Sequence, residues 1–196
     1  LEELSLPYNL VPVDIGKGEQ VAPKFLEISP NNRMPAITDP EGPDGAPISI
    51  FESGAILQYL AMKYDPDGFY GADIACFASA GRWIMWENNE LIPPMHTLVK
   101  HTIRLPEEQR ETAVAEAARA ALIKAWGIVE DQLSRTEHIA ADRWSYGDIP
   151  MTILVHRWAL LAGEEALSPN LARYYGQVSA RPSFDAVRDP AMHLAG

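Results

Sequence analysis

A change in the character of the chain near residue 64 constrains its fold more than any other feature. Before it, two short apolar runs, 35–38 and 47–51, flank a segment rich in proline, glycine and aspartate, which is typical of a hairpin. After it, the apolar residues recur with helical spacing, and no strand pattern is visible. The sequence therefore predicts a mixed α/β domain over 1–63, a linker over 64–73 and an all-helical domain over 74–196.

Further elements are expected inside the α/β domain. Alternating and β-branched residues predict a third strand over 8–14. A short helix is expected over 21–28, with Pro23 tolerated in its first turn. The hairpin is followed directly by a predicted amphipathic helix over 53–63.

Helices alone are expected in the second domain. They are predicted over 74–91, 106–133 and 170–180, and Pro93-Pro94 is expected to stop the first of them. Another helix start is indicated by Ser145 and Asp148, which form a capping-box pattern with Asp in place of the usual Glu. That helix should run to about Gly163, a plausible C-terminal stop.

Composition excludes several kinds of partner. The net charge of −11 argues against a general nucleic-acid surface, which needs a basic field, and against an anionic membrane surface. No apolar run is long enough to span a bilayer. The single cysteine, Cys76, rules out an internal disulfide framework, so a reducing compartment, the cytoplasm, is expected.

Two segments together indicate a small site for a charged peptide. Met34 and Pro35 precede a short strand, and the backbone of Met34 can pair with an extended ligand as an added strand does. Glu52 and Ser53 begin the following helix. Ser53, as N-cap, would hold a carboxylate with the helix dipole behind it, and Glu52 would bind an amine. The alternative is a proline at a strand edge and an ordinary helix cap.

Both segments and their spacing resemble the glutathione-binding half of the cytosolic glutathione transferases, strongly over 1–63 and more loosely afterwards. The resemblance implies a thioredoxin-like α/β domain followed by an all-α domain. It also implies that Pro35 is preceded by a cis peptide bond and that Met34 pairs with the cysteinyl backbone of glutathione. Glu52 and Ser53 would grip the γ-glutamyl end.

A narrower resemblance concerns the run 14–20, which is similar to that of the bacterial nu-class enzymes related to glutathione-dependent disulfide-bond reductases. It implies a ligand contact for Gln20. Arg33 is a candidate partner for the glycine carboxylate of glutathione. For both residues, the alternative is a polar surface position.

Residues 1–4 have the pattern of the end of an amphipathic helix. The resemblance implies a strand, a loop and most of a helix before Leu1. The first strand of the thioredoxin-like domain is therefore expected to be absent from this chain. In the nu-like relatives that loop carries the residues that activate the thiol. No catalytic residue is assigned in this sequence, and one expectation is that the chain as written lacks activity.

The implied function is that of an enzyme with glutathione as co-substrate. A free thiol titrates at about 8.5, so such an enzyme must favour the thiolate. The thiolate would attack an electrophilic carbon, as in a transferase, or a disulfide, as in a reductase. The resemblance also implies a homodimer. The alternative is a non-catalytic member of the fold that serves as a ligand-binding or scaffold protein.

In the helical domain, Arg82, Trp83 and Trp86 are candidates for a hydrophobic substrate site, because the family's electrophile lies against the matching helix. Core packing of the tryptophans is the favoured alternative. Cys76 is interpreted as buried rather than nucleophilic. No metal site is expected, because metal-like spacing is missing among His96, His101 and His138.

Overall fold

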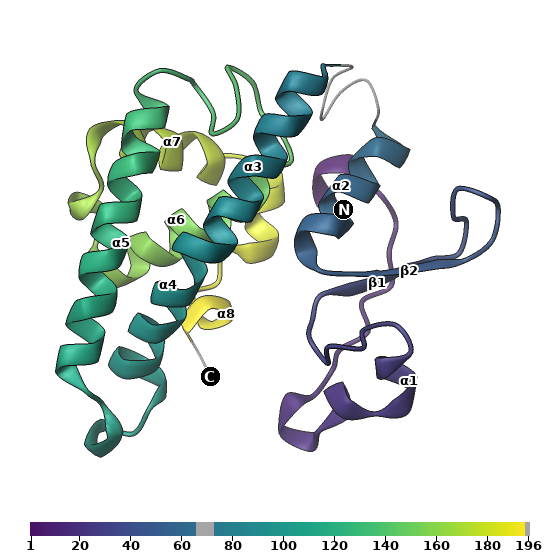
Figure 1. Ribbon diagram of the computed structural model, residues 1–196, viewed down its shortest axis with the longest axis horizontal. Helices are drawn as coiled ribbons and strands as arrows, with labels where there is room; N and C mark the ends of the chain where they lie inside the picture. Colours follow the sequence, from purple (N-terminus) through teal and green to yellow (C-terminus); the bar gives the residue numbers. More distant parts are fainter. Residues whose placement is uncertain (66–72, 195–196) are drawn as a thin grey trace. The chain divides into compact units, whose positions relative to one another are not determined.

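The structure, a computed structural model, describes residues 1–65 and 73–194. The chain forms two compact units, Leu1–Ala72 and Asp73–Gly196, called here the N-terminal and C-terminal units. The N-terminal unit has a thioredoxin-like α/β fold, and the C-terminal unit is helical, as the sequence predicts (Figure 1). The predicted linker over 64–73 lies mostly outside the described residues, and its boundaries stay a prediction.

An antiparallel hairpin and one helix form the centre of the N-terminal unit. The bounds are Ala36–Asp39 for β1, Ile48–Phe51 for β2 and Ser53–Tyr64 for α2. The register places Ala36 opposite Phe51. Helix α2 contacts both strands and buries Ile56, Leu60 and Ala61. The predicted hairpin and the helix that follows it are therefore confirmed.

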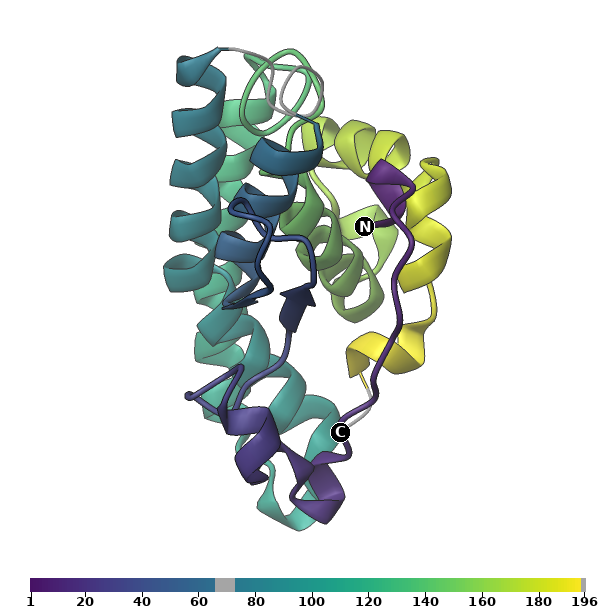
Figure 2. The same ribbon diagram turned by 90° about the vertical axis from the view of Figure 1, so that its right-hand side faces the viewer.

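The segment 8–14 is not a strand, which corrects the sequence prediction. Among the described residues the sheet contains β1 and β2 alone, so this segment has no neighbour with which to form a hydrogen-bond ladder. Figure 2 shows it as an extended trace in purple, and Leu10 and Val11 are 83% and 76% exposed. Alternating side chains are compatible with the two faces of a strand, but a strand also needs a neighbouring strand to which it can hydrogen-bond.

The predicted helix over 21–28 is shorter than expected. Helix α1 covers Pro23–Leu26, with Pro23 in its first turn, and no side chain caps its start. Val21 belongs instead to a preceding turn of 3-10 helix. The 3-10 turns of this unit are η1 (Glu2–Leu4), η2 (Ile15–Lys17) and η3 (Glu19–Val21).

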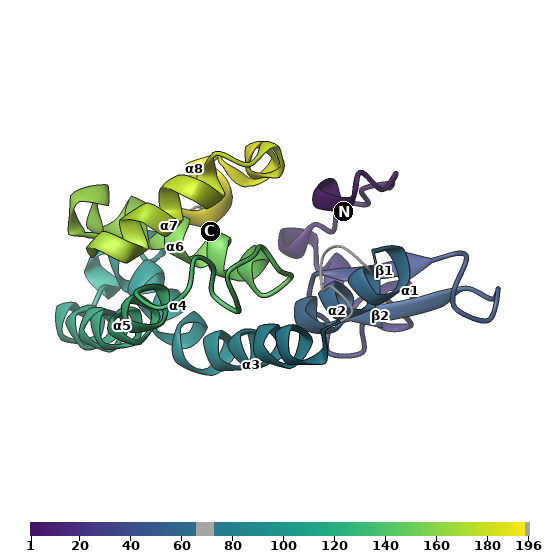
Figure 3. The ribbon, with the colours of Figure 1, turned by 90° about the horizontal axis from the view of Figure 1, so that it is seen from above.

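The C-terminal unit packs its helices around an apolar core. The bounds are Ile74–Glu90 (α3), Ile92–Val99 (α4), Thr112–Leu133 (α5), Asp148–Ala162 (α6), Pro169–Ser179 (α7) and Pro190–Leu194 (α8). Within this unit, α4 follows α3 and contacts α5, and α6 contacts α7 and α8 (Figure 3). None of the helices in the described ranges combines the length and the apolar character that crossing a membrane requires.

One predicted helix start in this unit is wrong, and one helix was not predicted. Helix α3 ends at Glu90, close to the predicted stop, but Pro93 and Pro94 then lie in the first turn of a new helix, α4, where a proline removes no needed donor. Helix α5 begins at Thr112 rather than at Pro106. The intervening chain folds into the 3-10 turn η5 (Glu107–Gln109) and is held by Arg110, whose guanidinium donates to backbone carbonyls upstream.

The predicted helix start at Ser145 and Asp148 forms in part. The Asp148 carboxylate accepts hydrogen bonds from the Ser145 N–H at 2.9 Å and from the Ser145 hydroxyl at 2.8 Å. The hydroxyl therefore donates to the carboxylate instead of accepting from a helix N–H, as it would in a complete capping box. The helix ends at Ala162, before Gly163 at a φ of 88°.

Candidate functional site

The two sequence motifs meet at one end of the hairpin. Because Ala36 pairs with Phe51, the residues just before β1 and just after β2 lie at the same end of the sheet. We call the four residues found there, Met34, Pro35, Glu52 and Ser53, the hairpin–helix corner. The Met34–Pro35 peptide bond is cis, as the resemblance implies.

Helix α2 begins at this corner without a side-chain cap. Glu52 is the N-cap residue, with φ 69° and ψ 117°, and no side-chain hydrogen bond caps the helix. Ser53 is the first helical residue and not the N-cap, which corrects the sequence prediction. Because Glu52 has a positive φ, the chain turns into the helix at Glu52, one residue before the predicted N-cap. The first N–H groups of α2, with the positive end of its dipole, are thereby left for a ligand.

The side chains of the corner are open to solvent. Glu52 and Ser53 are exposed, Met34 is 41% exposed, and Arg33 beside it is exposed as well. Neither Arg33 nor Glu52 forms an ion pair with any residue that the structure describes. One cation and one anion are therefore free to meet a ligand that carries both kinds of charge.

A short hydrogen-bond chain connects Glu52 to the loop before β1. The Asn31 side-chain amide donates to Glu52 Oε1 at 2.7 Å, and the Ser29 hydroxyl lies 2.8 Å from Asn31 Oδ1. Ser29 is fully buried, and its hydroxyl also lies 2.8 Å from the carbonyl oxygen of Arg33. Sequence reasoning missed Ser29 and Asn31, because these residue types near a proline are typical of any turn.

Gln20, predicted to touch the ligand, lies on η3, which packs against α1 and η2. Its Oε1 atom is buried and has no hydrogen-bond partner among the described residues. Within the described ranges, no hydrogen bond joins Gln20 to the hairpin–helix corner. Its role in binding stays a prediction.

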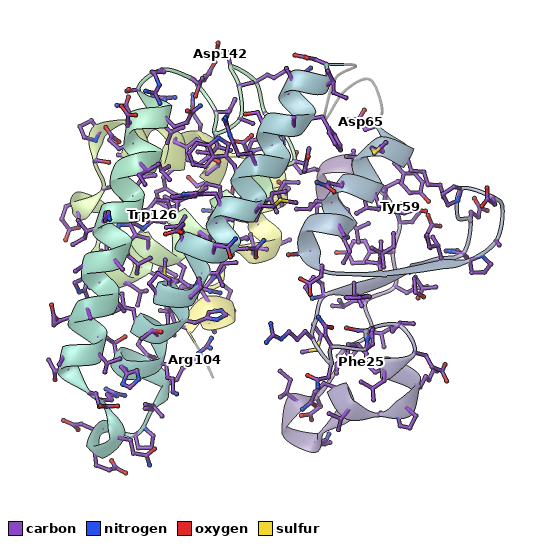
Figure 4. The ribbon with its side chains drawn as sticks, in the orientation of Figure 1. Phe25, Tyr59, Asp65, Arg104, Trp126 and Asp142 are labelled. Atoms are coloured by element: carbon purple, nitrogen blue, oxygen red, sulfur yellow. The ribbon has the colours of Figure 1, made fainter. Side chains whose placement is uncertain are left out.

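A second polar cluster holds α2 against the other end of β1. The Asp39 carboxylate accepts hydrogen bonds from Lys63 at 2.7 Å, Tyr59 at 2.6 Å and Tyr64 at 2.7 Å. Figure 4 labels Tyr59, which extends from α2. The Lys63 ammonium, helped by both tyrosines, holds the pKa of Asp39 well below its usual range, and Asp39 raises the pKa of Lys63. Asp39 was predicted only as part of the turn.

The candidate hydrophobic-substrate residues lie on α3. Trp83 is 6% exposed and meets the half-buried Trp86 edge to face, with ring centroids 5.2 Å apart. Arg82 is exposed and lies over the Trp83 ring at 5.7 Å. The burial of Trp83 favours the packing alternative for that residue. Cys76 is a buried free thiol, and no metal-binding cluster is present among the described residues.

The chain resembles proteins of one family over nearly all of its length. The N-terminal domain of glutathione S-transferases matches residues 1–62. The disulfide-bond oxidoreductase YfcG of Escherichia coli is 32% identical over 184 residues, which cover 93% of this chain and 84% of that protein.

Solved structures agree with that match. A glutathione transferase from Burkholderia graminis, with two glutathione molecules bound per subunit, has a TM-score of 0.83 at 32% identity and covers 96% of this chain and 80% of its own. A glutathione transferase from Pseudomonas putida, with one glutathione disulfide bound per subunit, has a TM-score of 0.81 at 27% identity. The match covers 96% of this chain and 83% of that one. The chain belongs to the glutathione S-transferase family.

Proposed function

We propose that this protein is a glutathione-dependent enzyme whose hairpin–helix corner binds glutathione. The observation that carries the proposal is the corner itself, where an uncapped helix start, a carboxylate without an ion-pair partner among the described residues and the exposed Met34 just before β1 lie together. Glutathione is an extended peptide with one ammonium group and two carboxylates, and each has a complementary group here.

In this proposal each residue of the corner takes one part of the tripeptide. Glu52 binds the γ-glutamyl ammonium, while Ser53 and the first N–H groups of α2 bind the γ-glutamyl carboxylate. The backbone of Met34, which precedes Pro35, pairs with the cysteinyl residue. Arg33 is proposed for the glycine carboxylate, and Gln20 for a further contact.

The bound glutathione then reacts through its thiolate. In transfer, sulfur bonds to an electrophilic carbon and the leaving group departs with its electron pair. In reduction, sulfur attacks a disulfide sulfur to form a mixed disulfide, the original S–S bond breaks, and the displaced thiolate takes up a proton. A second glutathione thiolate then attacks the glutathione sulfur of the mixed disulfide, which releases the second substrate thiolate and forms glutathione disulfide. Both reactions have counterparts among the relatives, by their names: glutathione transferases and a disulfide-bond oxidoreductase. These relatives give no support to the non-catalytic scaffold alternative.

Three finer statements belong to the same proposal. The second substrate lies against α3 at Arg82, Trp83 and Trp86, with Trp83 contributing mainly through packing. The protein works as a homodimer, as family membership suggests. It works in the cytoplasm, which fits a chain whose one cysteine is a free thiol.

Calorimetric titration of reduced and oxidised glutathione into the full-length protein tests the proposal. The test variant is Glu52→Ala with Ser53→Ala, and the matched control is Glu27→Ala, which removes an exposed carboxylate from the same unit. We expect the wild type and the control to bind and the double variant to lose binding. Tighter binding of the oxidised form would favour disulfide exchange. No heat from a folded wild-type protein would refute the glutathione site.

A further inference from the structure

The orientation of the Asn31 amide is fixed from both sides. Its nitrogen faces the Glu52 carboxylate at 2.7 Å, and its oxygen faces the Ser29 hydroxyl at 2.8 Å. A flipped amide would set its oxygen against the carboxylate and its nitrogen against the hydroxyl, losing the contact to Glu52. Ser29 is fully buried, so the chain of hydrogen bonds starts in the interior and ends at an exposed carboxylate.

From this geometry we propose that Asn31, held by Ser29, is a positioning residue for Glu52 and presents its carboxylate to the ammonium group of the ligand. The inference rests on the proposed glutathione site. Asn31 binds Oε1 and leaves Oε2 with its full acceptor capacity. An exposed glutamate would otherwise sample several rotamers, and ordering it before the ligand arrives lowers the entropy cost of binding.

The chemistry of the donor suits this role. An amide is neutral, so it holds the carboxylate without cancelling the charge that attracts an ammonium group. Lysine or arginine in the same place would form an ion pair with Glu52 and compete with the ligand. The Ser29 hydroxyl has one proton to share between two acceptors, Asn31 Oδ1 and the Arg33 carbonyl oxygen next to Met34, so one buried group lies between the two sides of the corner.

The test compares two ligands that differ by one group. Reduced glutathione carries the γ-glutamyl amine, and glutaryl-cysteinyl-glycine lacks it. We expect Asn31→Ala to weaken glutathione binding by about three- to tenfold, and to leave binding of the deaminated analogue within about twofold. In a Glu52→Ala background, Asn31→Ala should have no further effect on either ligand.

Two more variants guard against a loss of loop structure. Asn31→Asp keeps the size but replaces the donor by a second anion, so it should weaken glutathione at least as much as Asn31→Ala. Asn32→Gly is the matched control, because glycine tolerates the φ of 51° found there. It should bind both ligands as the wild type does. Denaturant midpoints of all variants report on folding.

The outcomes separate this inference from the proposed function. Equal weakening for both ligands, or an undiminished effect in the Glu52→Ala background, would show that Asn31 only shapes the loop and would overturn the inference while leaving the glutathione site intact. A folded wild type that binds neither ligand would refute both. Selective loss for the amine-bearing ligand would support both.

Discussion

Two carboxylates stand at helix starts in this molecule and are used in opposite ways. Asp148, at the start of α6, is fully buried and accepts from Ser145 N–H, Ser145 Oγ, Ile139 N–H at 2.9 Å and Tyr174 Oη at 3.0 Å. Glu52, at the start of α2, is exposed and accepts one hydrogen bond, from Asn31. The acceptor positions of Asp148 are filled by groups of the fold, whereas most of those of Glu52 remain open.

Acceptor occupancy, and not residue type or helix position, distinguishes the structural carboxylate of Asp148 from the Glu52 carboxylate that we propose for binding. Burial raises the pKa of the Asp148 carboxyl, and hydrogen bonds from Ile139 and Ser145 act against that rise. A group so enclosed has nothing left for a ligand. Glu52 keeps free acceptor lone pairs at the surface, which recognition of an ammonium group requires.

The largest effect is expected from Asp148→Ala. The substitution leaves four donors without their acceptor, and all four belong to the buried residues Ser145, Ile139 and Tyr174. We expect the free energy of unfolding to fall by about 3–5 kcal/mol, measured by urea denaturation.

Asp131→Ala is the matched control for that prediction. Asp131 is an exposed residue of α5 that pairs with Arg135 on the surface at 2.9 Å. Removing it should change the free energy of unfolding by no more than about 0.5 kcal/mol. If Asp148→Ala were as mild as this control, the four hydrogen bonds would not carry the stability that the comparison assigns to them.

Much of this contrast follows from sequence patterns. The hairpin, the helix after it and the start of α6 were predictable, because each depends on a pattern of residues that are contiguous in the sequence. The prediction of a strand over 8–14 was wrong, because a strand depends on a partner that periodicity within the segment cannot supply. Helix α3 ends at Glu90, close to the stop predicted from Pro93-Pro94, but α4 was missed, because a proline permits a helix start as readily as it enforces a stop.

The candidate site divides in the same way. Glu52 and Ser53 were predicted from their place before an apolar helix, although which of them is the N-cap depends on the backbone angle at Glu52. The supporting residues were not predictable. Asn31 reaches Glu52 across 21 positions, and Asp39 reaches Lys63 across 24. Contacts of this kind exist only once the chain has folded.

Glu52→Gln should give the opposite signature to Asp148→Ala. The amide oxygen can still accept from Asn31, so the corner keeps its shape, but the charge that holds an ammonium group is lost. We expect glutathione binding to weaken by about ten- to a hundredfold, measured by calorimetry. The free energy of unfolding should stay within about 0.5 kcal/mol of the wild type.

Glu27→Gln removes the same charge from another exposed position of the unit and should leave both quantities unchanged. A large loss of stability in Glu52→Gln would place Glu52 with Asp148 as a structural carboxylate. Unchanged glutathione binding would remove it from the site.

A third carboxyl group, that of Glu87, is buried like Asp148 but has fewer hydrogen-bond donors around it. Glu87 on α3 is 1% exposed, and its Oε2 has no hydrogen-bond partner among the described residues. Burial therefore raises the pKa of Glu87 well above the ordinary glutamate value of 4.5. The folded chain keeps this proton at pH values where the unfolded chain has lost it.

The contribution of Glu87 to stability is fully present below pH 4.5 and declines as the pH rises toward its folded pKa, by up to about 1.4 kcal/mol per pH unit. Glu87→Gln should remove this decline, so its denaturant midpoint should overtake that of the wild type as the pH rises. Glu90→Gln, an exposed change on the same helix, should follow the wild type. Parallel midpoints for Glu87→Gln and wild type from pH 5 to 8 would mean that Glu87 is ionised and satisfied like Asp148, and occupancy would then fail to distinguish the two.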